Sequence, residues 1–99
     1  MIEPHAIDLN LLSVFQEVYR ERQISSAARR LGLSQSAVSN ALARLRRSFG
    51  DELFVRTASG MQPTPLASQM AEPIGAAMAQ VALALNQRSR FEPATSNRR

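Results

Sequence analysis

Cysteine is absent from this 99-residue chain, and histidine occurs only once. Without cysteine the chain can form neither a disulfide nor a thiolate metal site, and nothing requires an oxidising compartment. The single histidine, His5, has no carboxylate or thiol at the spacing of a catalytic or metal-binding set. The sequence also has no glycine-rich phosphate loop. We therefore expect no enzymatic activity, no bound metal and no cofactor.

Long apolar runs are also missing. No run approaches the roughly 18 residues that a membrane-spanning helix needs. The N-terminus lacks a basic region followed by an apolar stretch, which is the pattern of a secretion signal. The length and the 44% hydrophobic content suit one small domain with one modest core. These features predict a soluble, cytoplasmic chain without a membrane partner.

Lysine is absent too, so all 12 basic residues are arginines, and the formal net charge is +4. The excess lies between residues 25 and 60, and acidic and basic residues cancel elsewhere. The arginines of this segment are Arg29, Arg30, Arg44, Arg46, Arg47 and Arg56, against Asp51 and Glu52. Such a segment suits a polyanionic partner. Arginine is also an ordinary residue on helix surfaces, so charge alone leaves both interpretations open.

Helical periodicity and capping residues predict two helices in the first third of the chain. Asp8 can cap a helix that runs to about Glu21. Its expected buried side consists of Leu11, Leu12, Phe15, Val18 and Tyr19. Ser25 and Ser26 are expected to cap a short second helix, AARRL, which Gly32 ends by adopting a left-handed conformation.

A third helix, capped by Ser34, has two distinct faces. Its apolar residues recur at steps of three and four and are Val38, Ala41, Leu42, Leu45 and Phe49. The polar side, with its flanking positions, carries Gln35, Ser36, Ser39, Asn40, Arg44 and Arg47. Amides and hydroxyls can bond base edges, and arginine can bond guanine or a phosphate. Two helices joined by a short turn with a glycine have the layout of a helix-turn-helix, whose second helix lies in the major groove of double-stranded DNA. Ser34 is counted with this polar set as a candidate DNA contact.

A hairpin, or wing, is expected after the third helix. The segments ELFVRT and MQP read as two short strands around an ASG turn. Arg56 on the first strand would reach the phosphates beside the groove, or the minor groove. The alternative is a solvent-facing arginine on an edge strand.

A long helix is predicted to begin at Thr64, as the cap, and Pro65, at the first helical position. Its apolar residues step by four, three and four, which is the seam of a helix pair, and are Ile74, Met78, Val81 and Leu85. Pro73 lies inside this helix and is expected to kink it. A helix of about 24 residues would extend ~36 Å, too far for so small a core to cover. We therefore expect it to pair with its own copy in a homodimer.

The run from Leu9 to Ala67 resembles the N-terminal DNA-binding region of LysR-type transcriptional regulators. The resemblance rests on AARRLGLSQSAVSNAL, LFVRT and PTPLA, in the order and spacing of that family. It implies a mainly α winged helix-turn-helix domain at residues 1–63, a linker helix for dimerisation at 64–90, and a tail at 91–99 that begins an absent effector-binding domain. The AVSNAL form and the ending FEPATSNRR resemble the branch that regulates aromatic degradation and nodulation. In the full-length protein the resemblance implies a tetramer and a small-molecule inducer held by the effector domain. A natural short protein is the alternative, and it would leave the tail without a purpose.

By matching positions, the DNA contacts of the family fall on Ser26, Gln35, Ser36, Ser39, Asn40 and Arg56. Ser36 stands where the family usually has proline, and Asn40 stands where many members have arginine, so a base preference cannot be carried over. The implied function is sequence-specific binding of an inverted-repeat promoter site as a dimer. The competing hypothesis is a helical interaction module with an acidic protein partner. That hypothesis accounts for the net charge and the long helix, but not for the amides and hydroxyls of the third helix or for the wing.

Overall fold

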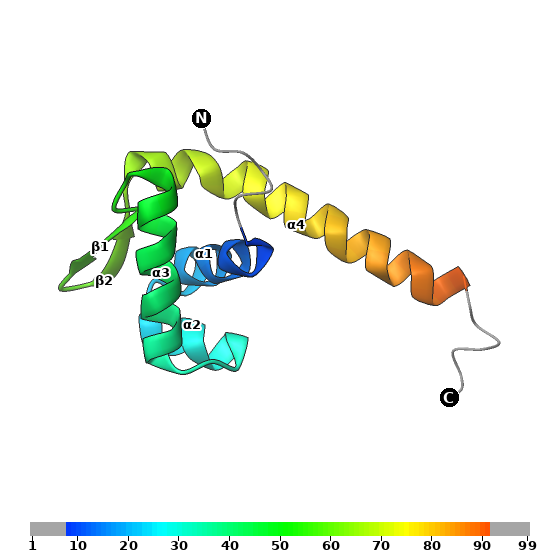
Figure 1. The fold of residues 1–99 in the computed structure, drawn as a ribbon, viewed down its shortest axis with the longest axis horizontal. Helices are drawn as coiled ribbons and strands as arrows, with labels where there is room; N and C mark the ends of the chain where they lie inside the picture. Colours follow the sequence, from blue (N-terminus) through cyan, green and yellow to red (C-terminus); the bar gives the residue numbers. More distant parts are fainter. Residues whose placement is uncertain (1–7, 92–99) are drawn as a thin grey trace.

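A computed structural model describes residues 8–91 of the chain, and their side chains as far as residue 87. Within this part the chain forms four helices and one antiparallel hairpin (Figure 1). The elements are α1 (Leu9–Glu21), α2 (Ile24–Leu31), α3 (Gln35–Phe49), β1 (Phe54–Thr57), β2 (Gly60–Pro63) and α4 (Pro65–Phe91). This order confirms the predicted mainly α winged helix-turn-helix with a long final helix. His5 and all of the predicted tail except Phe91, the last residue of α4, lie outside the described residues.

The limits of α1 agree with the prediction. Its N-cap is Asp8, whose Oδ1 accepts a hydrogen bond from the Asn10 N–H at 2.9 Å. Its buried residues are Leu11, Val14, Phe15 and Val18. The predicted buried side was therefore partly wrong, because it missed Val14 and included Leu12 and Tyr19, which are half-buried. The Tyr19 ring lies at the edge of the core, where the Arg22 guanidinium covers it at 4.7 Å from the ring centroid.

The start of α2 differs from the prediction. Ser25 and Ser26 are not caps, because the helix begins at Ile24 and its N-cap is Gln23, whose side chain makes no capping hydrogen bond. The physical reason is burial, since Ile24 packs in the core and the helix therefore begins three residues before the predicted first residue, Ala27. A preference for serine at the cap is worth about 1 kcal/mol, which burial of an isoleucine exceeds. The end at Gly32 is as predicted, in the left-handed conformation at φ 70°.

A single core joins the three helices of the domain to the wing. The buried residues are Leu11, Val14, Phe15, Val18, Ile24, Ala27, Ala28, Val38, Leu42, Leu45, Leu53, Phe54, Met61 and Ala67. From α3 the core takes Val38, Leu42 and Leu45, while Ala41 and Phe49 of the predicted apolar face are half-buried and pack against it. The Ser34 hydroxyl oxygen caps α3 by accepting a hydrogen bond from the Ala37 N–H at 3.0 Å. These contacts fix the rotation of α3 about its own axis.

The hairpin is docked on the turn between α1 and α2. Its register pairs Arg56 with Met61 and Thr57 with Gly60. The Met61 N–H donates to the Arg22 carbonyl oxygen at 2.7 Å. Gly60 permits this approach, because a Cβ at that position would lie 2.5 Å from the same oxygen and the residue has φ 118°. The predicted wing is therefore present, and it is held by the helical part of the domain.

Helix α4 begins on the domain and leaves it. The Thr64 Oγ1 accepts a hydrogen bond from the Ala67 N–H at 3.2 Å, which confirms the predicted cap. Leu66, Met70, Ala71 and Ile74 pack against the core. The helix remains a single element through Pro73 and extends well beyond α1 (Figure 1). No helix within residues 8–91 is long and apolar enough to cross a membrane.

Thr64 also links α4 to the segment between α3 and the wing, and this link can be tested. Its hydroxyl donates to Asp51 Oδ2 at 2.7 Å while it caps α4, so Thr64→Val removes both hydrogen bonds and keeps the shape of the side chain. We expect a loss of about 1–2 kcal/mol in the free energy of unfolding, seen as a lower urea midpoint with an unchanged slope. The control is Ser68→Ala, an exposed position in the same helical turn, which should change the midpoint little. Equal midpoints for the two variants would show that the Thr64 hydroxyl does not join α4 to the domain.

Candidate nucleic-acid interface

The outward face of α3 carries the predicted polar side chains. Because Val38, Leu42 and Leu45 face the core, the opposite side of the helix must face solvent. The exposed side chains there are Gln35, Ser36, Ser39, Asn40, Arg44 and Arg47. Within residues 8–91 the only hydrogen bond of this set is the 3.5 Å contact between the Ser36 and Ser34 hydroxyls. Their donors and acceptors are therefore available to a partner outside the chain.

The wing brings a further predicted residue to the same side of the domain. Arg56 is exposed on β1. It lines one concavity together with Ser39 of α3, although the two residues are 17 positions apart in the sequence. An object that lay against α3 would therefore also meet the wing.

Arg46 holds the wing beside α3, a role that no sequence pattern indicated. Its Nε donates to the Glu52 carbonyl oxygen at 2.8 Å, and its Nη2 donates to the Phe54 carbonyl oxygen at 3.0 Å. Its Nε also lies 3.7 Å from the Glu52 carboxylate. The guanidinium thus bonds the backbone where the chain leaves α3 and enters β1. Sequence patterns reveal no side-chain bonds to backbone carbonyls, so Arg46 was counted only as part of the basic excess.

The structure also divides the six arginines of the basic segment into two groups. Arg46 is bonded as described, and Arg30 of α2 lies 3.9 Å from Glu17 and 3.8 Å from Glu21 of α1. The other four arginines are Arg29, Arg44, Arg47 and Arg56. In the part of the chain that the structure describes, none of them has a carboxylate within 4.0 Å. The charge available to an anion therefore comes from these four side chains, fewer than the sequence count indicates.

Ser26 lies near the start of α2 rather than at its cap. It is half-buried, and its hydroxyl oxygen accepts a hydrogen bond from Arg29 Nη2 at 3.4 Å.

The described residues contain no group of three His, Cys, Asp or Glu side chains that could hold a metal ion.

These features define a class of protein. The domain has two helices joined by a short turn and a hairpin beside the second helix. The outward polar face of that second helix is uncommitted, meaning that its side chains make almost no hydrogen bonds within the described residues. This arrangement is a winged helix-turn-helix DNA-binding domain. The family model of the bacterial regulatory helix-turn-helix proteins of the lysR family matches residues 9–68. The chain belongs to this family, and its domain is the DNA-binding helix-turn-helix of LysR-type regulators. Membership of this family decides against the competing hypothesis of a helical interaction module with an acidic protein partner.

Curated relatives agree with this assignment. The chain is 50% identical over 97 residues to the transcriptional activator NahR of Pseudomonas putida, a match that covers 98% of the chain and 32% of NahR. It is 45% identical to nodulation protein D 1 of Bradyrhizobium sp. strain NC92, covering 94% of the chain and 30% of that protein. The name of the second relative agrees with the nodulation part of the predicted branch. The chain thus spans about a third of the length of the curated relatives that it matches.

Solved structures share the fold. A probable transcriptional regulator, PA0477 of Pseudomonas aeruginosa, superposes with a TM-score of 0.82 at 43% identity, over 84% of this chain and 28% of the other. The DNA-binding domain of BenM, solved in complex with catB site 1 DNA, superposes with a TM-score of 0.79 over 86% of this chain and 96% of the other. Its identity is 21%, so this likeness concerns the fold alone.

The role of Arg46 can be tested without any partner. Arg46→Met keeps an unbranched side chain in place of the apolar stem of Arg46 but removes the guanidinium and both of its hydrogen bonds to backbone carbonyls. We expect backbone amides of residues 54–63 to exchange their hydrogens about 5- to 30-fold faster, which corresponds to about 1–2 kcal/mol of lost local stability. The control is Arg47→Met, because Arg47 is the exposed neighbour without a side-chain partner in the described part of the chain. Exchange rates that match between the two variants would mean that the wing does not depend on the Arg46 guanidinium.

Proposed function

We propose that α3 enters the major groove of a promoter site and that the wing lies on the adjacent backbone or minor groove. The observation that carries the proposal is the uncommitted polar face of α3, which is densest in its N-terminal half. This is the part of a recognition helix that meets base edges. The BenM domain, which has the same fold, was solved in complex with DNA, and this supports DNA as the partner of the present domain.

Each side chain of this face has a chemistry that suits the proposal. The amides of Gln35 and Asn40 can each bond adenine through N6 and N7, and the Ser36 and Ser39 hydroxyls can bond either a donor or an acceptor in the groove. Ser34 is committed to capping α3, so it would meet DNA only with its remaining hydrogen-bonding capacity. Arg44 and Arg47 follow on the same face and suit guanine or phosphate, and Arg56 of the wing suits phosphate.

We infer further that α4 pairs two copies of the chain. Its 27 residues correspond to ~40 Å, and only its beginning packs on the domain. Of the predicted seam, Ile74 packs against its own core and Met78 is half-buried, whereas Val81 and Leu85 are 46% and 63% exposed. Exposed apolar side chains at helical spacing favour a second helix as the partner.

A symmetric pair would read an inverted repeat. Two recognition helices related by a twofold axis would enter successive major grooves about one turn, or ~34 Å, apart. Such binding should need no metal or small molecule. A tetramer and an inducer would involve only the effector-binding domain of a full-length regulator. Binding of the protein to a promoter would place it in the cytoplasm.

Base reading and phosphate binding can be separated with two substitutions. Asn40→Ala should weaken binding by about 1–3 kcal/mol on the preferred duplex and little on random duplex, as expected of a base-edge contact. Arg56→Ala should weaken both and reduce the slope of log affinity against log salt by about one. The measurement is titration of labelled duplex by fluorescence anisotropy at several salt concentrations. If Asn40→Ala weakens both duplexes equally, Asn40 does not read a base.

The predicted seam of α4 can be tested by introducing a charged side chain at one of its positions. Val81→Arg should place two like charges in the contact and give a folded monomer, detected by sedimentation equilibrium. Its binding to a site with two half-sites should fall far more than its binding to one half-site, because the second contact is no longer intramolecular. Ala79→Arg is the control, since Ala79 is exposed and lies about 200° around α4 from Val81. A dimer that persists in Val81→Arg places the interface elsewhere.

A further inference from the structure

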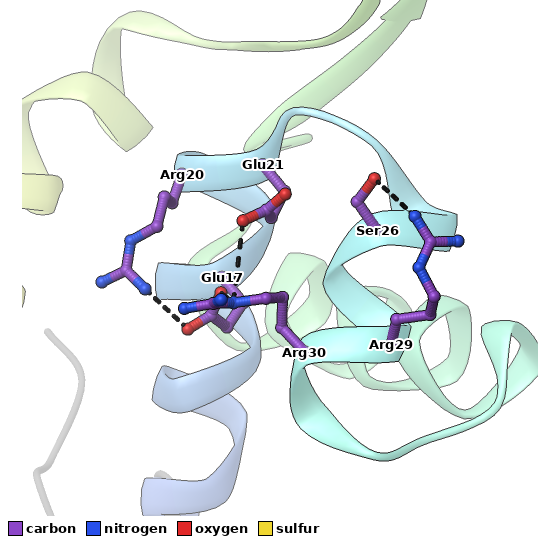
Figure 2. A network of polar contacts seen from close by, with 6 residues as sticks. All are labelled: Glu17, Arg20, Glu21, Ser26, Arg29 and Arg30. Carbon is purple, nitrogen blue, oxygen red and sulfur yellow. Dashed lines mark hydrogen bonds and ion pairs between the residues drawn. The ribbon is translucent and has the colours of Figure 1, made fainter.

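Two consecutive arginines of α2 are held in different ways (Figure 2). Arg30 extends toward α1, where its Nε lies 3.9 Å from Glu17 Oε1 and 3.8 Å from Glu21 Oε2. Arg29 extends away from α1, and its Nη2 donates to the Ser26 hydroxyl oxygen at 3.4 Å. The two side chains have the same charge and are both exposed, but within the described residues only Arg30 lies near carboxylates.

The pairing on α1 leaves no excess of either charge there. Glu17 also accepts a hydrogen bond from Arg20 Nη1 at 2.9 Å, so the group holds the two carboxylates of Glu17 and Glu21 and the two guanidinium groups of Arg20 and Arg30. Among residues 8–91, Arg29 has no carboxylate within 4.0 Å. The positive charge that α2 presents to an external anion therefore comes from Arg29.

Helix geometry places the Arg29 guanidinium at the N-terminal end of α2. Side chains of a helix lean toward its N-terminus, and a residue three positions later lies on the same face. The contact with Ser26 is the result of this lean. The buried residues of α2, Ile24, Ala27 and Ala28, lie on the other side of the helix, so the Ser26–Arg29 pair faces outward.

The contact between the two side chains leaves most of their hydrogen-bonding capacity unused. At 3.4 Å it is a long hydrogen bond, and it occupies one of the five guanidinium N–H donors. The Ser26 hydroxyl can still donate its own hydrogen. A guanidinium and a hydroxyl that point to the same space suit a phosphate, whose oxygens accept from both and whose charge the arginine balances.

We propose that Arg29 and Ser26 together bind one backbone phosphate of the DNA, at a position separate from those of α3 and the wing. The inference rests on the proposed function, since the first helix of a helix-turn-helix crosses the DNA backbone. It adds an arginine that neither the family resemblance nor the polar face of α3 indicates. Arg29 binds the phosphate, and Arg30 joins α2 to α1.

The test compares Arg29→Gln with Arg30→Gln in the whole chain, because both changes remove one positive charge from adjacent positions. Affinity for a preferred duplex and for a random duplex is measured over a range of salt concentrations. Arg29→Gln should weaken binding to both duplexes about tenfold and reduce the salt slope by about 0.9, the share of one phosphate. Arg30→Gln should leave the slope unchanged and lower the urea midpoint instead, because it removes the ion pairs with α1.

A third variant tests the serine. Ser26→Ala should weaken binding to both duplexes about threefold with no change in slope, because a hydroxyl carries no charge. Equal reductions of the slope in Arg29→Gln and Arg30→Gln would assign the effect to net charge and overturn the proposal. Parent-like affinity in Ser26→Ala would also overturn it as a joint contact. If the parent chain binds no duplex at low salt, the proposed function itself fails, and this outcome is distinct from the other two.

Discussion

The burial of one face of α3 is the constraint on which the rest of the structure depends. Three side chains at helical spacing, Val38, Leu42 and Leu45, are almost completely enclosed by the core. A rotation of α3 by one residue would turn its surface by about 100° and expose them. The core therefore fixes which side chains remain outside, and Ser39 and Asn40 are among them. One face of α3 thus stabilises the fold, and the opposite face is the one that we propose reads DNA.

A second constraint holds the wing and α4 at fixed positions relative to α3. The link between α3 and β1 passes through Leu53, which has φ 64° and a completely buried side chain. A left-handed conformation costs a residue with a Cβ about 1–2 kcal/mol, and burial of the leucine side chain offsets this. Asp51 Oδ2 accepts hydrogen bonds from the Leu53 N–H at 2.8 Å and from the Thr64 hydroxyl at 2.7 Å. One carboxylate therefore joins the end of α3, the base of the wing and the start of α4. A change in the direction of α4 would therefore strain the hydrogen bonds at the base of the wing.

The sequence predicted those elements whose signals are local. The caps Asp8, Ser34 and Thr64 and the C-cap Gly32 mark helix ends through bonds that span a few residues, and all four were found. The hairpin was predicted from its turn and its β-prone residues. The start of α2 was not, because the burial of Ile24 depends on segments that lie elsewhere in the chain.

The contacts within the candidate site were harder to predict for the same reason. The polar residues of α3 follow from periodicity, so their common face could be found from the sequence. The commitment of Arg46 to the wing and of Arg30 to α1 depends on packing between elements, and residue counts treat all arginines alike. The sequence therefore counted all six arginines of the basic segment in its charge excess, although Arg30 and Arg46 contact groups of their own chain.

The proposed function requires that the outward face of α3 reads base sequence, and that two copies of the chain do so together. Selection of bound duplexes from a random pool tests it most directly, because it assumes no operator. We expect enrichment of one twofold-symmetric sequence whose half-sites have centres about one helical turn apart. Retention of all sequences with equal affinity would contradict it, because the face of α3 would then contact only phosphates.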